Sequence, residues 1–291
     1  MLGYPFDKVN TIYYQGEPGA YSDLASKILF PADLRRIGLN QFEDVFESVR
    51  KGGEKVLAIL PIENSIHGSV HPVYDLLQKH HFFIQMEFKL RVEHCLLANY
   101  DTVIGTIKEV YSHPQAIGQC SSFFANHPHI HPVPWYDTAG SAKYIAEQKS
   151  NNTIAAIASR EAAKVYGLDI LLTNIESFDH NFTRFIVVSL LEYYQPDADK
   201  TALILETNNE PGALYKCLGV FAEKGIDLLK IESRPVWGKP WKHLFYLDIR
   251  GSYVSEKVKD AIQLLGQFTE YTRILGSFKE DRSEEGHGTA L

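Results

Sequence analysis

Hydrophobic and polar positions follow two different periods along the first two thirds of the chain. Short β-rich runs such as Thr11–Gln15 and 56–62 alternate with stretches in which apolar residues recur every three or four positions, as between Phe42 and Val49. The same rhythm continues through Glu109–Ser112, a helix opened by Pro114, a strand near Val133, a helix at about 141–148 and a strand at 153–158. This order predicts an α/β fold whose helices cover a mostly parallel sheet.

The pattern changes after a polar, proline-containing stretch, EYYQPDADK (192–200), which is typical of a linker. The segments that follow predict the order strand, helix, strand, strand, helix, strand. This order is that of a ferredoxin-like βαββαβ unit. The last residues, KEDRSEEGHGTAL (279–291), are charged and contain glycine, so we expect a disordered tail.

Composition places the chain among ordinary globular proteins. Its 291 residues suggest about two domains, with 45% hydrophobic and 22% charged residues. The net charge of −7 gives no electrostatic reason to bind nucleic acid or an anionic membrane. Three scattered cysteines, no signal-peptide pattern and no membrane-length apolar run predict a cytoplasmic protein with reduced thiols.

Four polar clusters lie at the junctions between predicted strands and the helices that follow them. They are GEPGAYS (16–22), PIENSIHGS (61–69), SHPQAIGQC (112–120) and YDTAGSA (136–142). Each alone is more typical of helix capping. Four on one α/β scaffold, with Thr183 and Arg184 at the start of a further strand, indicate a cleft whose amides and hydroxyls bind an anion.

These motifs, together with AAIAS (155–159) and NFTRF (181–185), resemble the prephenate dehydratase family, including its arogenate dehydratase branch. EPGAL (210–214) and KIESRP (230–235) resemble the phenylalanine-binding ACT domain of these enzymes. The resemblance covers about 11–278. It implies a catalytic domain at 10–192 with two lobes like those of type II periplasmic binding proteins, and an ACT domain at 200–278. Lobe 1 is expected at 10–88 and 175–192, and lobe 2 at 89–174.

The family's reaction is the decarboxylating dehydration of prephenate to phenylpyruvate, a step of L-phenylalanine biosynthesis. The resemblance therefore implies a carbon–oxygen lyase. The substrate carries two carboxylates and a ring hydroxyl, and the new aromatic ring drives the reaction. A proton or a strong hydrogen bond must reach the leaving oxygen. The chemistry requires no electron sink, so we expect no cofactor and no metal.

The resemblance also implies roles for particular residues. Thr183 is expected to contact the leaving hydroxyl, and Arg184 to support the substrate's negative charge or the loop. Phe185 completes this motif. Substrate carboxylates and ring oxygen are assigned to Asn64, Ser22, Ser65, Ser112, Gln119 and Thr138. Because a threonine hydroxyl is a very weak acid, either Glu63 relays a proton to it or Thr183 mainly positions and polarises the leaving group.

Phenylalanine is expected to bind where two ACT domains meet, as a feedback inhibitor of a homodimer or homotetramer. The candidate residues are Asn209, Pro211, Gly212, Ala213, Leu214, Glu232, Ser233, Arg234 and Pro235.

Several alternatives remain open at the sequence level. Ala20-Tyr21 and YDTAGSA depart from the common bacterial motifs, so arogenate is an alternative substrate. A non-catalytic amino-acid sensor is another. The histidines of NHPHIHP (126–132) lack partners for a metal site, and His113 is interpreted as support for the loop before Pro114.

Overall fold

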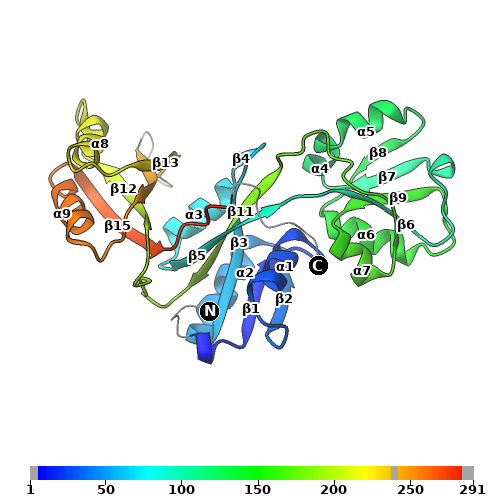
Figure 1. Ribbon diagram of the computed structural model, residues 1–291, viewed down its shortest axis with the longest axis horizontal. Coiled ribbons are helices and arrows are strands. Elements are labelled where there is room, and N and C mark those ends of the chain that lie inside the picture. Colours follow the sequence, from blue (N-terminus) through cyan, green and yellow to red (C-terminus); the bar gives the residue numbers. More distant parts are fainter. Residues whose placement is uncertain (1–5, 237–241, 284–291) are drawn as a thin grey trace.

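The structure is a computed structural model that describes residues 6–236 and 242–283. Three sheets with covering helices follow one another along the long axis of the molecule (Figure 1). We call them lobe 1, lobe 2 and the C-terminal domain. No helix in the described part of the chain is both long and apolar enough to cross a membrane.

Lobe 1 is built on a sheet with the order β2-β1-β3-β11-β5, to which β4 adds beside β3. The strand β1 pairs in parallel with β2 and β3, whereas β11 is antiparallel to both β3 and β5. Its strands are β1 (Thr11–Gln15), β2 (Arg35–Leu39), β3 (Val56–Asn64), β4 (Gly68–Ser69), β5 (Phe83–Arg91) and β11 (Phe182–Ser189). Its helices are α1 (Tyr21–Leu29), α2 (Phe42–Gly52) and α3 (His71–Lys79), with 3₁₀ turns at Phe6–Lys8 and Gly53–Lys55.

Lobe 2 has a second sheet, of order β10-β6-β9-β7-β8. Helices α4 and α5 cover one face and α6 and α7 the other (Figure 1). The chain enters this lobe between β5 and β6 and leaves it between β10 and β11. Its strands are β6 (Cys95–Ala98), β7 (Glu109–Ser112), β8 (His131–Pro134), β9 (Ile154–Ala158) and β10 (Asp169–Leu172). Its helices are α4 (Pro114–Gln119), α5 (Ser121–Asn126), α6 (Thr138–Glu147) and α7 (Arg160–Tyr166), with a 3₁₀ turn at Ile104–Thr106.

The C-terminal domain has the strand order β13-β14-β12-β15, all antiparallel, which is that of the predicted ferredoxin-like unit. The predicted fold class, two α/β lobes followed by a βαββαβ domain, is confirmed. The elements are β12 (Lys200–Thr207), α8 (Ala213–Glu223), β13 (Leu228–Pro235), β14 (His243–Arg250), α9 (Glu256–Leu265) and β15 (Thr269–Phe278).

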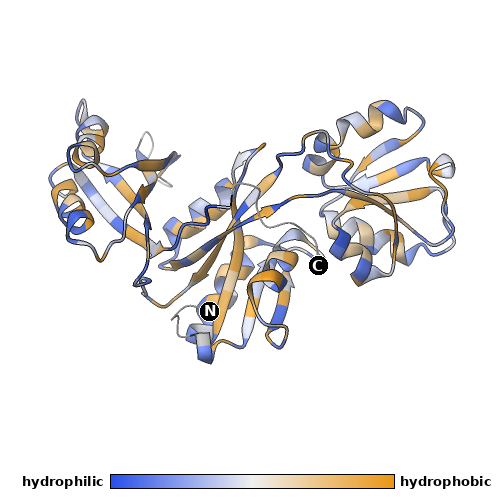
Figure 2. Cartoon of the chain, viewed as in Figure 1, coloured by the Kyte–Doolittle hydropathy of each residue, from blue (hydrophilic) through white to orange (hydrophobic). Residues whose placement is uncertain are grey.

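The C-terminal domain and lobe 1 share one hydrophobic core. Ile204 and Tyr246 of the C-terminal sheet pack in the same buried cluster as Leu60 and Tyr74 of lobe 1. The backbones approach so closely that a side chain at Gly276 would overlap the carbonyl of Ile84. Figure 2 shows hydrophobic residues concentrated on the central strands of the sheets, with hydrophilic residues on the outer surfaces of the helices. The C-terminal domain is therefore packed onto lobe 1 rather than tethered to it.

Two expectations need correction. The sheets of both lobes are mixed, because the strands that carry the chain between the lobes run against their neighbours. The expected disorder from residue 279 is wrong for 279–283: Asp281 accepts a hydrogen bond from Lys89 N at 2.7 Å, and Glu280 N donates to Asp199 at 2.7 Å. The rest of the expected tail lies outside the described residues.

Candidate active site in the interlobe cleft

A cavity of about 570 Å³ lies between lobe 1 and lobe 2. Lobe 1 contributes the start of α1, the end of β3 with the turn to β4, and the start of β11. Lobe 2 contributes the starts of α4 and α6. Of the expected site residues, Ser22, Asn64, Gln119, Thr138, Thr183 and Phe185 line this cavity.

Strand pairing explains how two motifs that are far apart in the sequence meet at the cleft. In the β3–β11 register Thr183 lies opposite Asn64, and Asn64 Nδ2 donates to Thr183 Oγ1 at 3.1 Å. The amide of Asn64 is itself fixed, because its Oδ1 accepts from the backbone N–H groups of Ile66 and His67, both at 3.0 Å. Since Thr183 accepts a hydrogen bond here, its own proton can be donated to a ligand.

The neighbouring pair in the same register, Arg184 and Glu63, points the other way. Side chains alternate along a strand, so Thr183 faces the cleft and Arg184 faces the C-terminal domain. The Arg184 guanidinium lies 2.7 Å from Asp248 and 3.4 Å from Glu63. Neither Arg184 nor Glu63 lines the cavity. In this structure both side chains therefore lie away from the cavity, on the face opposite to the one expected for contact with the substrate's charge or for a proton relay to Thr183.

Arg184 and Glu63 belong to a buried ionic cluster between lobe 1 and the C-terminal domain. Its three cations and three anions are balanced. Although burial opposes ionisation, Arg184 and Lys200 hold the pKa of Asp248 below its usual value. The members are Arg184, Lys200, Lys230, Glu63, Glu87 and Asp248, and the closest pairs include Lys200–Glu87 and Lys230–Glu63, both at 2.8 Å.

Two further expected substrate residues, Ser65 and Ser112, form hydrogen bonds with the backbone and do not line the cavity. Ser65 Oγ donates to His180 O and accepts from Phe182 N, both at 2.9 Å, which fixes the loop before β11. Ser112 is fully buried and donates to Ile157 O at 2.7 Å. Their hydroxyls are therefore used within the protein.

Histidines form a part of the cleft that the motif analysis missed. His67, His71, His94 and His113 all line the cavity. His94 Nε2 lies 2.7 Å from Gln119 Oε1, and Gln119 Nε2 lies 3.1 Å from His67 Nδ1, so these side chains join lobe 2 to lobe 1. Burial lowers the pKa of His94 to about 4, and this imidazole is neutral at physiological pH.

His67 and His71 stood within or beside a recognised motif and could have been found there. His94 lies in the crossing between lobes and carried no sequence signal. His113 has two functions: its Nδ1 accepts from Gln115 N at 3.2 Å, as expected for loop support, and its side chain also faces the cavity.

The expected phenylalanine-site residues cluster at one end of the C-terminal sheet. Strands β12 and β13 both end there, flanking the first residue of β14. Asn209 and Pro211 lie in the turn before α8, and Gly212 caps this helix with φ +80°, followed by Ala213 and Leu214. Ser233 Oγ lies 3.3 Å from His243 Nδ1, and Pro235 ends β13.

Two of these residues reach back to lobe 1. Glu232 accepts a hydrogen bond from Ser69 Oγ at 2.6 Å, and Arg234 pairs with both carboxylate oxygens of Asp75 at 3.0 and 2.8 Å. The strand expected to bind an effector therefore also contacts lobe 1, and one of the residues it contacts, Ser69, lines the cavity.

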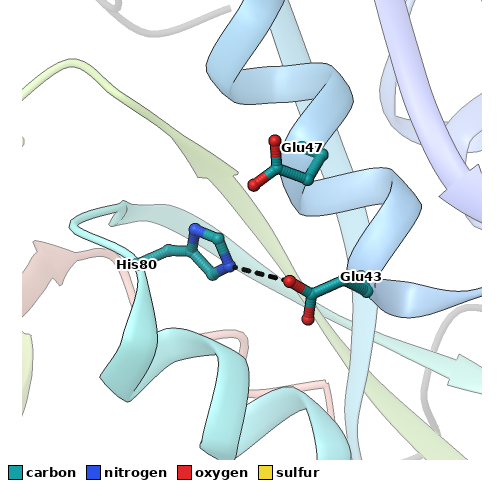
Figure 3. A group of neighbouring side chains, drawn as sticks. All are labelled: Glu43, Glu47 and His80. Carbon is teal, nitrogen blue, oxygen red and sulfur yellow. Dashed lines mark ion pairs between the residues drawn. The ribbon is translucent and has the colours of Figure 1, made fainter.

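A separate polar group, Glu43, Glu47 and His80, brings possible metal-ligand atoms within 4.8 Å of one another (Figure 3). Lys79 pairs with Glu43 at 2.5 Å and Arg50 with Glu47 at 2.7 Å. Since both carboxylates already have cationic partners, the group is an ion-pair cluster at the surface of lobe 1.

The fold and the cleft define a class of protein: a two-lobed α/β ligand-binding scaffold joined to a ferredoxin-like domain. Polar side chains of the two lobes contact each other at the cleft. Comparison with known proteins narrows this class. The model of the family described as prephenate dehydratase matches residues 12–192. The chain belongs to the prephenate dehydratase family, whose activity is that of a hydro-lyase.

Three proteins that are similar to this chain carry different descriptions. Arogenate dehydratase 2 of Petunia hybrida is 38% identical over 290 residues, covering 93% of this chain and 72% of that protein. The structure of prephenate dehydratase from Arthrobacter aurescens in complex with L-Phe has a TM-score of 0.85 and 31% identity, over 93% and 90% of the two chains. A structure described as a novel type of quorum quenching acylase also has a TM-score of 0.85, with 33% identity over 94% and 98%.

Proposed function

We propose that this protein converts prephenate to phenylpyruvate by decarboxylating dehydration. The observation that carries the proposal is the hydroxyl of Thr183, oriented by Asn64 at 3.1 Å and directed into the interlobe cavity. The bond to the ring carboxylate breaks and releases carbon dioxide. Its electron pair enters the ring, the carbon–oxygen bond to the ring hydroxyl breaks, and the departing hydroxide takes up a proton to form water.

The cleft supplies hydrogen bonds for both ends of such a substrate. The N-terminal turns of α1 and α6 face the cavity through Ser22 and Thr138, and backbone N–H groups at helix starts favour carboxylates. Asp137 caps α6 by accepting from Gly140 N at 2.7 Å, which holds this helix start in place. Thr183 contributes by donating a hydrogen bond to the leaving oxygen as negative charge develops there.

Arogenate is the alternative substrate, because it shares the ring and both carboxylates and the similar plant protein is named for it. Incubation with prephenate should give phenylpyruvate, detected by its absorbance, and incubation with arogenate should give phenylalanine at a lower kcat/KM. An N-acyl amide is the third substrate to be assayed, because one of the similar structures is described as an acylase. Hydrolysis of the amide without turnover of prephenate or arogenate would overturn the proposal. If none of the three compounds were turned over, the non-catalytic amino-acid sensor would remain as the interpretation.

We further propose feedback inhibition by L-phenylalanine at the end of the C-terminal sheet. The two candidate segments lie at that end on either side of β14, and a solved relative is described in complex with L-Phe. The ligand's carboxylate fits the N–H groups at the start of α8, and a second copy of the chain in a homodimer or homotetramer completes the site. The three cysteines are free and buried, which supports a reducing compartment such as the cytoplasm.

The conformation of Gly212 provides a test of this regulatory site. An alanine is strained at φ +80° by about 1 kcal/mol or more, so Gly212→Ala should displace the turn that leads into α8. We expect the phenylalanine concentration for half-inhibition to rise about tenfold, measured on the full chain. Gly219→Ala, inside the same helix with open space around it, is the matched control and should keep normal inhibition. Equal inhibition of both variants and the parent would contradict the assignment.

A further inference from the structure

The cleft contains no permanent cation among its described lining residues. Among the residues that the structure describes, neither lysine nor arginine lines the cavity, and Asp137 is the one carboxylate. The substrate of the proposed function, on which this inference rests, carries two carboxylates. The side chains of the described lining that can become positive are histidines, whose charge changes between pH 5 and 8.

Two of the four histidines that line the cavity are poorly suited to carry a positive charge for the substrate carboxylates. His94 is buried and stays neutral, as its lowered pKa of about 4 requires. His113 also has a lowered pKa, mainly because of burial, with an opposing contribution from Asp137. His67 and His71 remain, and both lie on the segment that joins β3 to α3.

His71 has a carboxylate partner from a different domain. Its Nε2 lies 3.4 Å from Glu232 Oε1, and the contact is an ion pair only when His71 is protonated. His71 is the first residue of α3, where the helix dipole opposes a positive charge. Glu232 on β13 offsets that effect, and its other oxygen accepts the 2.6 Å hydrogen bond from Ser69, which also lines the cavity.

Other charged side chains lie near this pair. Arg234 on β13 interacts electrostatically with Glu232, but it also pairs with Asp75 on α3 at 2.8 Å. Lys230 on β13 donates to Ser69 Oγ at 3.2 Å, but it also pairs with Glu63 at 2.8 Å, which balances its charge. Across the cleft lie His113 and Asp137 of lobe 2, and His67 is the neighbour on the same segment. Glu232 is therefore the carboxylate of the C-terminal domain that contacts His71.

We propose that protonated His71, with Glu232 of the C-terminal domain as its counter-ion, is a specificity-determining residue that favours a substrate with two uncompensated carboxylates. Prephenate carries two negative charges and no positive one, whereas the ammonium group of arogenate offsets one of its two. A positive cleft wall therefore attracts prephenate more strongly. Because Glu232 also belongs to the candidate phenylalanine site, an effector that recruits this carboxylate removes the counter-ion of His71.

Binding measurements test the inference separately from turnover. Thr183→Ala is used as the parent, so that the ligand persists, and calorimetry gives Kd for prephenate and arogenate at pH 6 and pH 8. In the parent we expect prephenate to bind about fivefold more tightly at pH 6, with a smaller change for arogenate. His71→Asn should remove that pH dependence, and His131→Asn, at an exposed position on the edge strand β8 of lobe 2, should keep it.

Glu232→Gln in the same parent keeps a hydrogen-bonding group for Ser69 but removes the counter-ion. It should reduce the pH dependence as His71→Asn does. A prephenate Kd that changes with pH in both variants as in the parent would overturn the inference. If His71→Asn lost the pH dependence of Kd but Glu232→Gln kept it, the role assigned to Glu232 would be overturned. Binding of neither ligand to the parent would instead refute the proposed function, and with it this inference.

Discussion

Replacing Thr183 by alanine should lower kcat for prephenate by about 10²- to 10³-fold, the effect expected when one donor to a developing oxyanion is removed. Asn64 Nδ2 donates to Thr183 Oγ1, so the threonine proton is directed to the leaving oxygen rather than to Asn64. The alanine variant keeps the strand intact, because residue 183 pairs with Asn64 and Leu90 through its backbone. Steady-state kinetics at saturating substrate measure the loss.

The control for this prediction is Thr183→Ser, which keeps the hydroxyl and loses only a methyl group. It should retain most of kcat, and both variants should unfold at a temperature close to that of the original protein. If the alanine variant turned over prephenate at a near-normal rate, Thr183 would not act on the leaving group. An equal loss in the serine and alanine variants would point to packing of the methyl group instead.

The motifs identified the residues around the cleft but not the direction in which each side chain points. NFTRF and PIENS identified Thr183 and Asn64, which the β3–β11 register then placed opposite each other. Arg184 and Glu63 belong to the same motifs, yet they occupy the other face of the sheet. A motif on a strand names adjacent residues, and adjacent residues point to opposite faces. The face of the sheet that the C-terminal domain covers cannot face the cleft, so the tertiary packing decides which of the adjacent residues reaches the cavity.

Long-range packing accounts for the other misses. Lys200 stands at the end of the polar stretch 192–200, which reads as a linker, yet its ammonium is almost fully buried against Glu87. That burial exists only because the C-terminal sheet covers lobe 1, a contact between segments more than 100 residues apart. His94 reaches the cleft for a similar reason, since it lies where the chain crosses between the lobes. Local patterns predict elements well and predict such contacts poorly.

The buried ionic cluster leads to the second large prediction, for Asp248→Asn. This substitution preserves shape and removes one of the cluster's three negative charges, a buried one, which leaves Arg184 and Lys200 with one carboxylate fewer. Breaking a buried pair by removing one partner costs about 3–5 kcal/mol, because the remaining charge is uncompensated. We expect a loss of that size in the free energy of unfolding, measured by urea denaturation with the original protein in parallel.

The same substitution should also lower kcat, because Arg184 immediately follows Thr183 on β11 and Asp248 fixes its guanidinium at 2.7 Å. Asp227→Asn is the matched control: it removes a carboxylate from the same domain, but one that pairs with Arg250 at the exposed surface, and it should change little. If Asp248→Asn were as stable and as active as Asp227→Asn, the ionic cluster would contribute neither to the free energy of unfolding nor to kcat. If stability fell while kcat of the folded enzyme stayed unchanged, the C-terminal domain would hold lobe 1 together without setting the position of Thr183.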